Sequence, residues 1–278
     1  MSDICAVILA AGEGRRLRPL TALVPKALCP VGNLPLVDHA LARVARLGLA
    51  GPATVAVNAS YLRDQVVTHV GGRTHISPED HPLGTSGGVG NLRTWIDGRG
   101  VLVGNADAYL AGPGADPAAL LDGWDGESVR LFGQPAPDEP YGFSGHRFAG
   151  FSLLPWRYVR DLTPEPAELV RTVWRPAEAE GAMEVVPFAG TYLDTGTPRD
   201  YLAANLHAAG SGSLIAPDAR VTGPVERAVV GAGAVVEGRL TRSVVWPGGQ
   251  VEPGEHLVDA IRMGADLTVR VEVHPIVT

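Results

Sequence analysis

Apolar and polar positions alternate in blocks through the first two thirds of the chain. Residues 4–10 form a continuous apolar run, which is typical of a strand buried on both faces of a parallel sheet. Residues 36–47 have a helical periodicity that stops at Gly48. Strands alternating with helices predict an α/β fold with a mostly parallel sheet, in which ligands bind beyond the carboxyl ends of the strands. The further predicted strands are 53–57, 74–77, 101–103 and 151–154, and the further predicted helices are 61–70, 86–96 and 198–208.

Three segments interrupt this pattern and indicate how the chain is divided. Residues 12–35 form a polar loop punctuated by glycine and proline. Residues 135–150 lose regular periodicity, which we interpret as the irregular part of a substrate cleft. Residues 209–213 read Ala-Gly-Ser-Gly-Ser, a composition typical of a flexible hinge. We therefore expect a main domain over residues 1–209 and a second domain over residues 213–278.

Beyond the hinge, aliphatic residues recur at spacings of six or near multiples of six, with small turn residues between them. This pattern resembles the hexapeptide repeats of a left-handed β-helix. The alternative interpretation is an irregular β-meander. The recurring positions are Ile215, Val221, Val230, Val236, Val245, Val251 and Leu257.

The composition limits the classes of function. Of the 278 residues, 45% are hydrophobic and 19% are charged, as in ordinary globular proteins. The formal net charge of −7 argues against nonspecific nucleic-acid binding, which requires a basic surface. No apolar run approaches the roughly 20 residues of a membrane helix, no signal peptide is recognised, and two cysteines provide no disulfide framework. We expect a cytoplasmic protein that binds neither nucleic acid nor membrane.

The most distinctive chemistry follows the first predicted strand. Residues 12–17 form neither a dinucleotide fingerprint, because Leu17 occupies the third glycine position, nor a P-loop. The loop still offers backbone N–H groups to a phosphate chain, and Arg15, Arg16 and Arg18 add forked donors. Lys26 is the only lysine in the chain, beside 22 arginines. This usage indicates a position where a compact ammonium is required and arginine does not substitute.

Residues 9–21 and 25–31 resemble the signature of sugar-1-phosphate nucleotidylyltransferases, the enzymes that make nucleotide sugars. They read Leu-Ala-Ala-Gly-Glu-Gly-Arg-Arg-Leu-Arg-Pro-Leu-Thr and Pro-Lys-Ala-Leu-Cys-Pro-Val. Three further segments agree in order: 82–88 resembles the family's base-binding loop, 103–107 its strand-end metal aspartate, and 192–198 its second metal-binding segment. The resemblance covers about residues 4–208, with weak support between 110 and 185. It implies a Rossmann-like domain, and many members also carry a β-helical tail.

The resemblance implies roles for individual residues. Arg16 would hold the pyrophosphate leaving group, Lys26 the phosphates around the reacting centre, and Asp107 and Asp194 a Mg²⁺ ion, which prefers carboxylate and phosphate oxygens. Taken alone, each aspartate is as often structural. Arg16, Lys26 and Asp107 are the predicted catalytic residues. The predicted nucleotide-binding residues are Leu9, Ala10, Ala11, Gly12, Glu13, Gly14, Glu79, Gly84 and Thr85, and the predicted sugar-phosphate-binding residues are Gly150, Arg147 and Asp194.

Glu79 bears on the choice of base. Several relatives that read uracil, thymine or adenine carry glutamine at this position. A carboxylate accepts hydrogen bonds and donates none, which suits the adjacent N1–H and N2–H₂ donors of guanine. Uracil, with one N3–H between two carbonyls, suits an amide better. The residue therefore favours GTP, and the alternative is that Glu79 and Asp80 form a solvated acidic run.

One departure from the family pattern concerns the sugar site. Many members carry Glu-Lys-Pro in mid-chain, with that lysine contacting the sugar phosphate, and this chain has no second lysine. Arg147 or Arg130 would replace it, or residues 141–145 mark a subgroup with a different sugar site. Residues 148–151 resemble the family's Asn-Ala-Gly segment without its polar side chains. The identity of the sugar stays open at this point.

The sequence thus favours a Mg²⁺-dependent enzyme that joins a nucleoside triphosphate to a sugar 1-phosphate. The favoured substrates are GTP and mannose 1-phosphate or a related hexose, heptose or cyclitol phosphate. One alternative is uridylyl or thymidylyl transfer within the same family. Another is a noncatalytic regulatory homologue that binds nucleotide sugars, which the missing lysine favours and the retained Arg16, Lys26, Asp107 and Asp194 disfavour. Because short β-helices leave an apolar end to cover, we expect a homodimer.

Overall fold

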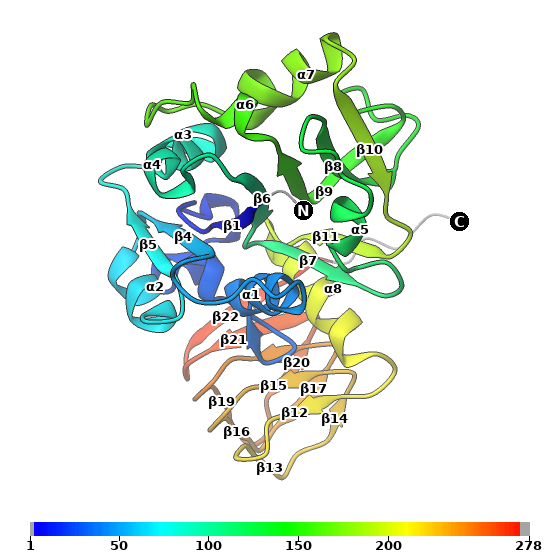
Figure 1. Cartoon of the computed structure of the whole chain (residues 1–278). Helices are drawn as coiled ribbons and strands as arrows, with labels where there is room; N and C mark the ends of the chain where they lie inside the picture. The colour runs from blue at the N-terminus through cyan, green and yellow to red at the C-terminus, as the bar shows by residue number, and fades with distance from the viewer. Residues whose placement is uncertain (1–2, 273–278) are drawn as a thin grey trace. The chain divides into compact units, whose positions relative to one another are not determined.

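The computed structural model describes residues 3–272 (Figure 1). It contains two compact units, each built from separate stretches of the chain. The loop that follows the first strand is shared between them, so the signature segment contributes to both. Of the described residues, the first unit holds 3–13, 24–28 and 37–192, and the second holds 14–23, 29–36 and 193–272.

A seven-stranded sheet with the order β10-β8-β9-β6-β1-β4-β5 forms the first unit (Figure 1). β1 (Ile4–Leu9) pairs in parallel with β4 (Val55–Ala59) on one side and with β6 (Gly100–Asn105) on the other. β4 pairs in parallel with β5 (His75–Pro78). The α/β fold with a mostly parallel sheet, predicted from the sequence, is confirmed.

The other edge of the sheet is partly antiparallel. β9 (His146–Leu154) runs antiparallel to both β6 and β8 (Val129–Pro135), and β10 (Met183–Pro187) pairs in parallel with β8. The prediction that residues 135–150 are irregular is therefore wrong at its carboxyl end, because β9 begins at residue 146. Only the turn between β8 and β9 fits that description.

Both faces of the sheet are covered by helices, which explains the continuous apolar run of β1. Ala6 and Ile8 belong to one buried cluster, and Cys5 and Val7 belong to the other, because side chains alternate across a strand. The first cluster includes residues of α1 (Leu36–Arg46), α2 (Arg63–Val70) and α5 (Ala118–Leu121). The second includes residues of α3 (Gly84–Asn91), α4 (Arg93–Ile96), α6 (Trp156–Val159), a π-helix (Val170–Trp174) and α7 (Arg175–Ala179).

In the second unit, a small hairpin from the signature loop packs on a helix near the end of the predicted main domain. β2 (Pro30–Val31) pairs with β3 (Leu34–Pro35), and the carbonyl oxygen of Pro30 accepts hydrogen bonds from Tyr201 and Asn205 of α8 (Pro198–Ala209). The Thr197 side chain caps α8 by accepting a hydrogen bond from the N–H of Asp200. The helix predicted over 198–208 is confirmed.

The strands after α8 form three parallel sheets, in which each strand from β12 to β18 pairs with the strand three places later. β22 closes the last coil antiparallel to β21. The strands are β12 (Leu214–Ile215), β13 (Arg220–Val221), β14 (Val225–Glu226), β15 (Val229–Val230), β16 (Val235–Val236), β17 (Arg239–Thr241), β18 (Val244–Val245), β19 (Gln250–Val251), β20 (His256–Val258), β21 (Ala260–Met263) and β22 (Leu267–Arg270).

The period of these coils differs from the predicted multiples of six. Val221 pairs with Val236 and Val236 with Val251, and in each case 15 residues separate the partners. Leu240 pairs with Leu257 across 17 residues. A step of six residues leads from one strand to the next strand of the same coil. A further nine residues lead to the first strand of the next coil.

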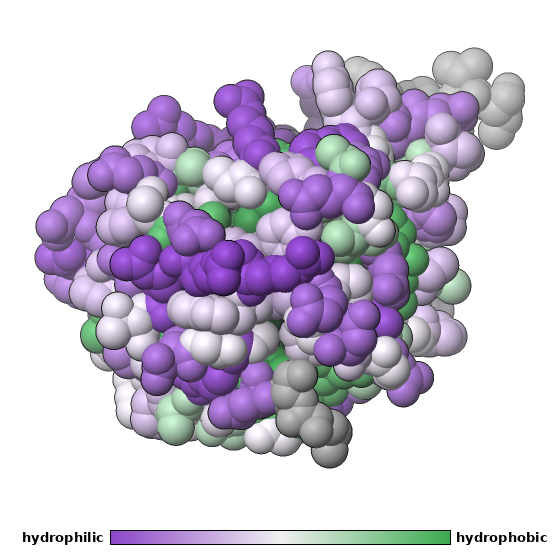
Figure 2. Space-filling model, turned by 45° about the horizontal axis from the view of Figure 1, so that its top comes forward, coloured by the Kyte–Doolittle hydropathy of each residue, from purple (hydrophilic) through white to green (hydrophobic). Residues whose placement is uncertain are grey.

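The face of the molecule drawn in Figure 2 is mostly polar. On this face, hydrophilic residues predominate and hydrophobic ones form small separate areas. The large hydrophobic side chains that are exposed among residues 3–272 are Leu23, Leu34, Tyr141, Leu214 and Ile215. Within the same residues, every helix is too short or too polar to span a bilayer.

Candidate active site

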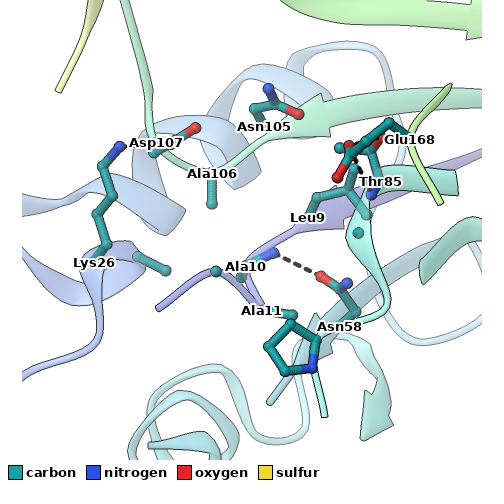
Figure 3. Close-up of a pocket in the computed structure, with 14 residues that line it drawn as sticks. Leu9, Ala10, Ala11, Lys26, Asn58, Thr85, Asn105, Ala106, Asp107 and Glu168 are labelled. Carbon is teal, nitrogen blue, oxygen red and sulfur yellow. Dashed lines mark hydrogen bonds and ion pairs between the residues drawn. The ribbon is translucent and has the colours of Figure 1, made fainter. Parts of the chain in front are cut away.

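The carboxyl ends of β1, β4 and β6 surround an open cavity of about 240 Å³ in the first unit (Figure 3). This is where a parallel α/β sheet is expected to bind its ligand. Lys26 and Asp107 lie at one end of the view, and Thr85 and Glu168 lie at the other. The lining residues are Leu9, Ala10, Ala11, Gly12, Lys26, Ala27, Asn58, Pro82, Gly84, Thr85, Asn105, Ala106, Asp107 and Glu168.

Lys26 and Asp107 are brought together at this cavity from positions 81 residues apart. Lys26 lies on a 3₁₀ turn (Lys26–Leu28), and Asp107 lies just beyond the end of β6. The Lys26 Nζ donates a hydrogen bond of 2.6 Å to the Asp107 Oδ2. The lysine side chain is only 9% exposed, whereas that of Asp107 is 39% exposed. A nearly buried ammonium is thus held by a carboxylate that still faces solvent.

Asn58, at the carboxyl end of β4, fixes the loop that follows β1. Its Oδ1 accepts a hydrogen bond of 2.6 Å from the N–H of Ala10, and its Nδ2 donates one of 2.7 Å to the Oε1 of Glu79. The other Glu79 oxygen accepts a bond of 3.1 Å from the N–H of Leu83. Burial raises the pKa of the Glu79 carboxyl, while the bonds from Asn58 and Leu83 act in the opposite direction.

Glu79 is 3% exposed and is not among the described residues that line the cavity. Both of its oxygens are already bonded to protein groups, one to Asn58 and one to Leu83. The solvated acidic run considered above therefore does not describe Glu79. A direct contact between Glu79 and a base stays a prediction from the sequence.

The amino end of α3 carries the predicted base-loop residues. Gly84 has a positive φ of 70°, and a Cβ there would lie 2.5 Å from the carbonyl oxygen of Ala167. The hydroxyl of Thr85 donates a hydrogen bond of 2.7 Å to the Oε2 of Glu168. Gly84, Thr85 and Glu168 thus line the cavity together, and Glu168 comes from a distant part of the chain. A role for Gly84 and Thr85 in binding the base stays a prediction.

A second ionic pair lies in the second unit. The Arg16 Nη2 is 3.3 Å from the Asp194 Oδ2, and both side chains are substantially exposed. Gly196 lies against this pair, because a Cβ there would be 2.6 Å from the same Arg16 nitrogen. Gly14 adopts a left-handed conformation, and its carbonyl accepts a hydrogen bond from Thr21. Glu13, which is predicted from the sequence to bind the nucleotide, belongs to the first unit instead.

The two arginines considered as substitutes for the family's lysine differ in their surroundings. Arg130 is nearly buried, and it bonds to Glu184 at 2.9 Å and to three carbonyl oxygens of α5 and the turn after it. Its guanidinium is therefore engaged in hydrogen bonds that stabilise the fold. Arg147, on β9, is exposed, bonds to Gln134, and lies over the Tyr192 ring at 5.4 Å. Arg147 is the candidate that remains.

Gly150 also lies on β9, and its local packing requires glycine. Its φ is 80°, and a Cβ would lie 2.4 Å from the Cβ of Ala108 on β7 (Ala108–Ala111). Neither Gly150 nor Arg147 is among the described residues that line the cavity. A role for either in sugar-phosphate binding stays a prediction.

Two of the described cavity residues, Asn58 and Glu168, lie outside every segment that was singled out from the sequence. Asn58 ends an apolar strand, so a polar residue at a strand's carboxyl end was a signal that could have identified it. Glu168 follows a proline-rich stretch with no recognisable spacing to any motif. Its position depends on contacts with α3 that only the folded chain reveals.

Comparisons with known proteins show which proteins the chain is similar to. Residues 5–114 match the family model described as nucleotidyl transferase. The chain is 29% identical over 298 residues to the mannose-1-phosphate guanylyltransferase of Mycobacterium tuberculosis, in an alignment covering 93% of this chain and 79% of that protein. The predicted relationship to sugar-1-phosphate nucleotidyltransferases is confirmed. Because the matched relatives are named as transferases, the prediction of an enzyme of this class is supported as well.

The chain is also similar to two nucleotidyltransferases that are named for other substrates. Over 134 residues it is 36% identical to the N-acetylmuramate α-1-phosphate uridylyltransferase of Caulobacter vibrioides, covering 45% of this chain and 54% of that protein. It also resembles a solved structure from Bacillus anthracis, described as a candidate glucose-1-phosphate thymidylyltransferase, with a TM-score of 0.63. That likeness covers 74% of this chain and 95% of the other at 18% identity, and it concerns the fold alone.

Proposed function

We propose that this protein transfers a nucleotidyl group from GTP to mannose 1-phosphate or a related sugar or cyclitol phosphate, releasing pyrophosphate. The observation that carries the proposal is the pairing of Lys26 with Asp107 at the cavity beyond β1 and β6. A single retained ammonium beside a strand-end carboxylate is suited to holding phosphate groups at a reacting centre.

The chemistry requires little from the protein beyond positioning. An oxygen of the sugar phosphate attacks the α-phosphorus of the triphosphate, and the bond to the pyrophosphate oxygen breaks. The second pKa of a phosphate monoester is about 6, so the attacking group is mostly dianionic at neutral pH and needs no general base. Lys26 would neutralise charge that develops on the phosphates, and Asp107 fixes the direction of its ammonium. Arg16 would bind the departing pyrophosphate.

Asp107, in the first unit, and Asp194, in the second, are each proposed as a carboxylate ligand for magnesium, as the family resemblance implies. Both are carboxylates that remain partly exposed, at 39% and 46%. Among residues 3–272 no three acidic, histidine or cysteine groups form a cluster able to hold a metal by themselves. Mg²⁺ is commonly bound by one or two carboxylates together with substrate phosphates, so a small protein ligand set is compatible with it. The ion would supply neutralisation of phosphate charge.

GTP and mannose 1-phosphate are proposed because the relative aligned along 93% of this chain is named for them. The uridylyltransferase relative provides the second candidate, in which UTP and an amino-sugar acid phosphate replace them. The absence of a second lysine keeps a noncatalytic binding role as a third candidate.

The organisation of the chain and its assembly are also proposals. We propose a catalytic domain over 1–209 and a left-handed β-helix-like domain over 213–278, in which the 15- and 17-residue coils take the place of hexapeptide turns. Residues 1–2 and 273–278 of these two ranges lie outside the described residues. Exposed Leu214 and Ile215 on the first coil support self-association, and we propose a homodimer. A cytoplasmic location stays a prediction from the sequence.

Pyrophosphate release tests the function directly. Each nucleoside triphosphate is crossed with a panel of sugar 1-phosphates, with Mg²⁺ and with a chelator, using the wild type, Asp107→Asn and Asp80→Asn. Asp80 is the matched control because it is an aspartate paired with an arginine outside the cavity, 93% exposed. Turnover that needs Mg²⁺ and Asp107 but not Asp80 supports the proposal. Nucleotide binding without turnover on the whole panel supports the noncatalytic alternative.

A further inference from the structure

Residues 163–168, hereafter the 163–168 strap, are fixed against one face of α3. Gly84, Gly87 and Gly90 form this face, and a Cβ at each would lie between 2.3 and 2.5 Å from a carbonyl oxygen of the strap. The strap can approach so closely only because these three positions lack side chains. The contact therefore places the strap backbone within a narrow range.

Hydrogen bonds on both sides of Glu168 hold its backbone. The N–H of Ala167 donates to the carbonyl of Leu83 at 3.0 Å, and the carbonyl of Ala167 accepts from the N–H of Ser86 at 2.9 Å. On the other side, the N–H of Leu169 donates to the hydroxyl of Thr85 at 2.8 Å. Glu168 is thus presented to the cavity from an anchored position rather than from a free loop.

The two oxygens of the Glu168 carboxylate have different surroundings. Oε2 accepts hydrogen bonds from the hydroxyl of Thr85 at 2.7 Å and from its N–H at 3.3 Å. Oε1 lies beside Gly84, 2.8 Å from where a Cβ of that glycine would be. Among residues 3–272, no group donates a hydrogen bond to Oε1. A preorganised acceptor is therefore available at the end of the cavity opposite Lys26 (Figure 3).

Glu168 contrasts with Glu79, the carboxylate that the sequence alone suggests for reading the base. Glu79 is buried, and its oxygens are occupied by Asn58 and Leu83. Glu168 is exposed to the cavity and retains acceptor capacity. Asp107 and Glu168 put a carboxylate at each end of the cavity, but among the described lining residues Lys26 alone supplies a cation, so the nucleotide would place its phosphates toward Lys26 and its base toward Glu168.

We infer that Glu168 is the residue that selects guanine. This inference rests on the proposed function and deepens its nucleotide preference. The N1–H and N2–H₂ groups of guanine are adjacent donors, and the two lone pairs of Glu168 Oε1 can accept from both. Adenine offers an acceptor at N1, and uracil offers one N–H between two carbonyls, so either base would leave Glu168 facing an acceptor. Asn58 and Glu79 act by positioning the loop around this contact.

Glutamine at position 168 tests the inference without disturbing the anchor. Its amide oxygen still accepts a hydrogen bond from Thr85, while its NH₂ group turns a donor toward the donors of guanine. Glu165→Gln is the matched control, because Glu165 lies on the same strap, is exposed, and does not line the cavity. Titration calorimetry with GTP, ITP and UTP in the presence of Mg²⁺ measures binding without requiring an acceptor sugar. ITP isolates the N2–H₂ contact because it lacks only that amino group.

We expect the wild type and Glu165→Gln to bind GTP more tightly than ITP and UTP. In Glu168→Gln the preference for GTP over UTP should fall by roughly tenfold to a hundredfold, which corresponds to losing a hydrogen bond to a charged group. An unchanged preference in Glu168→Gln overturns the inference and leaves the proposed function in place. Equal weakening for all three nucleotides also overturns it, since that pattern indicates a structural role. A wild type without preference for GTP overturns both this inference and the proposed base, whereas pyrophosphate release reports separately on the enzymatic activity.

Discussion

Replacing Lys26 by glutamine removes the ammonium while keeping most of the side-chain volume. Unit charges 2.6 Å apart attract each other by roughly 6 kcal/mol at an effective dielectric constant of about 20. Desolvation of the nearly buried ammonium offsets much of this gain, and the 39% exposure of Asp107 screens the rest. We therefore expect the free energy of unfolding to fall by about 2 kcal/mol, and kcat/KM for pyrophosphate release to fall by roughly a hundredfold or more.

Urea unfolding followed by tryptophan fluorescence provides the stability assay, and pyrophosphate release provides the rate. Arg63→Gln is the control, because it removes the cation of the exposed Arg63–Asp80 pair and should cost about 0.5 kcal/mol or less. The double variant Lys26→Gln/Asp107→Asn should recover part of the stability, since the carboxylate that the ammonium neutralises is removed together with it. Its turnover should stay low.

Lys26→Arg separates charge from shape. The side chain at this position is only 9% exposed, so a broad guanidinium has little room while the positive charge is retained. We expect stability closer to the wild type than that of Lys26→Gln, with turnover still strongly reduced. Wild-type turnover in the arginine variant would refute the requirement for a compact ammonium at this site. Wild-type stability in the glutamine variant would show that the Lys26–Asp107 pair does not stabilise the fold.

Three further predictions concern buried groups. Burial raises the pKa of the Glu79 carboxyl above its ordinary value of 4.5. The protonated carboxyl therefore contributes stability below pH 4.5, and this contribution is lost as pH rises through the raised pKa. The difference in unfolding free energy between wild type and Glu79→Gln should change over that pH window. Gly87→Ala would place a Cβ 2.3 Å from the carbonyl oxygen of Glu165 and should cost about 2 kcal/mol in urea unfolding, whereas Gly212→Ala meets no atom within 4 Å and should cost far less. Burial raises the pKa of the Cys5 thiol to about 12, so mass spectrometry should find it unmodified by a thiolate-specific reagent until the protein unfolds.

Most of the sheet strands that could be predicted from the sequence are buried along most of their length. β1 is buried on both faces, so its apolar run is continuous and its prediction succeeded. β10 is only partly buried along its length, and it carries a glutamate and ends at a proline, so no pattern indicated a strand there. The coils after α8 were visible as a repeat, but their period was not, because six-residue and nine-residue spacings alternate along the chain.

The candidate site was predictable where each residue lies within a local motif. Lys26 and Asp107 each belong to a signature segment, and the structure places their charged groups in contact. Residue type alone could not show that the Glu79 oxygens are occupied by Asn58 and Leu83, since the bond to Asn58 joins two separate strand ends. Glu168 was out of reach for a similar reason. Its place depends on glycines of α3 that lie about 80 residues earlier in the chain.

The second unit joins the earliest and the latest parts of the chain, which has a consequence during synthesis. Arg16, Gly32 and Asn33 find partners 178, 173 and 197 residues later, at Asp194, Asn205 and Val230. At about 5–20 residues per second, a ribosome needs roughly ten to forty seconds to make the intervening chain. The arginine-rich signature loop is thus synthesised early, before the residues that it contacts in the folded protein have been translated. We expect nascent chains stalled before residue 193 to expose this loop to proteases, although every strand of the seven-stranded sheet has been made by then.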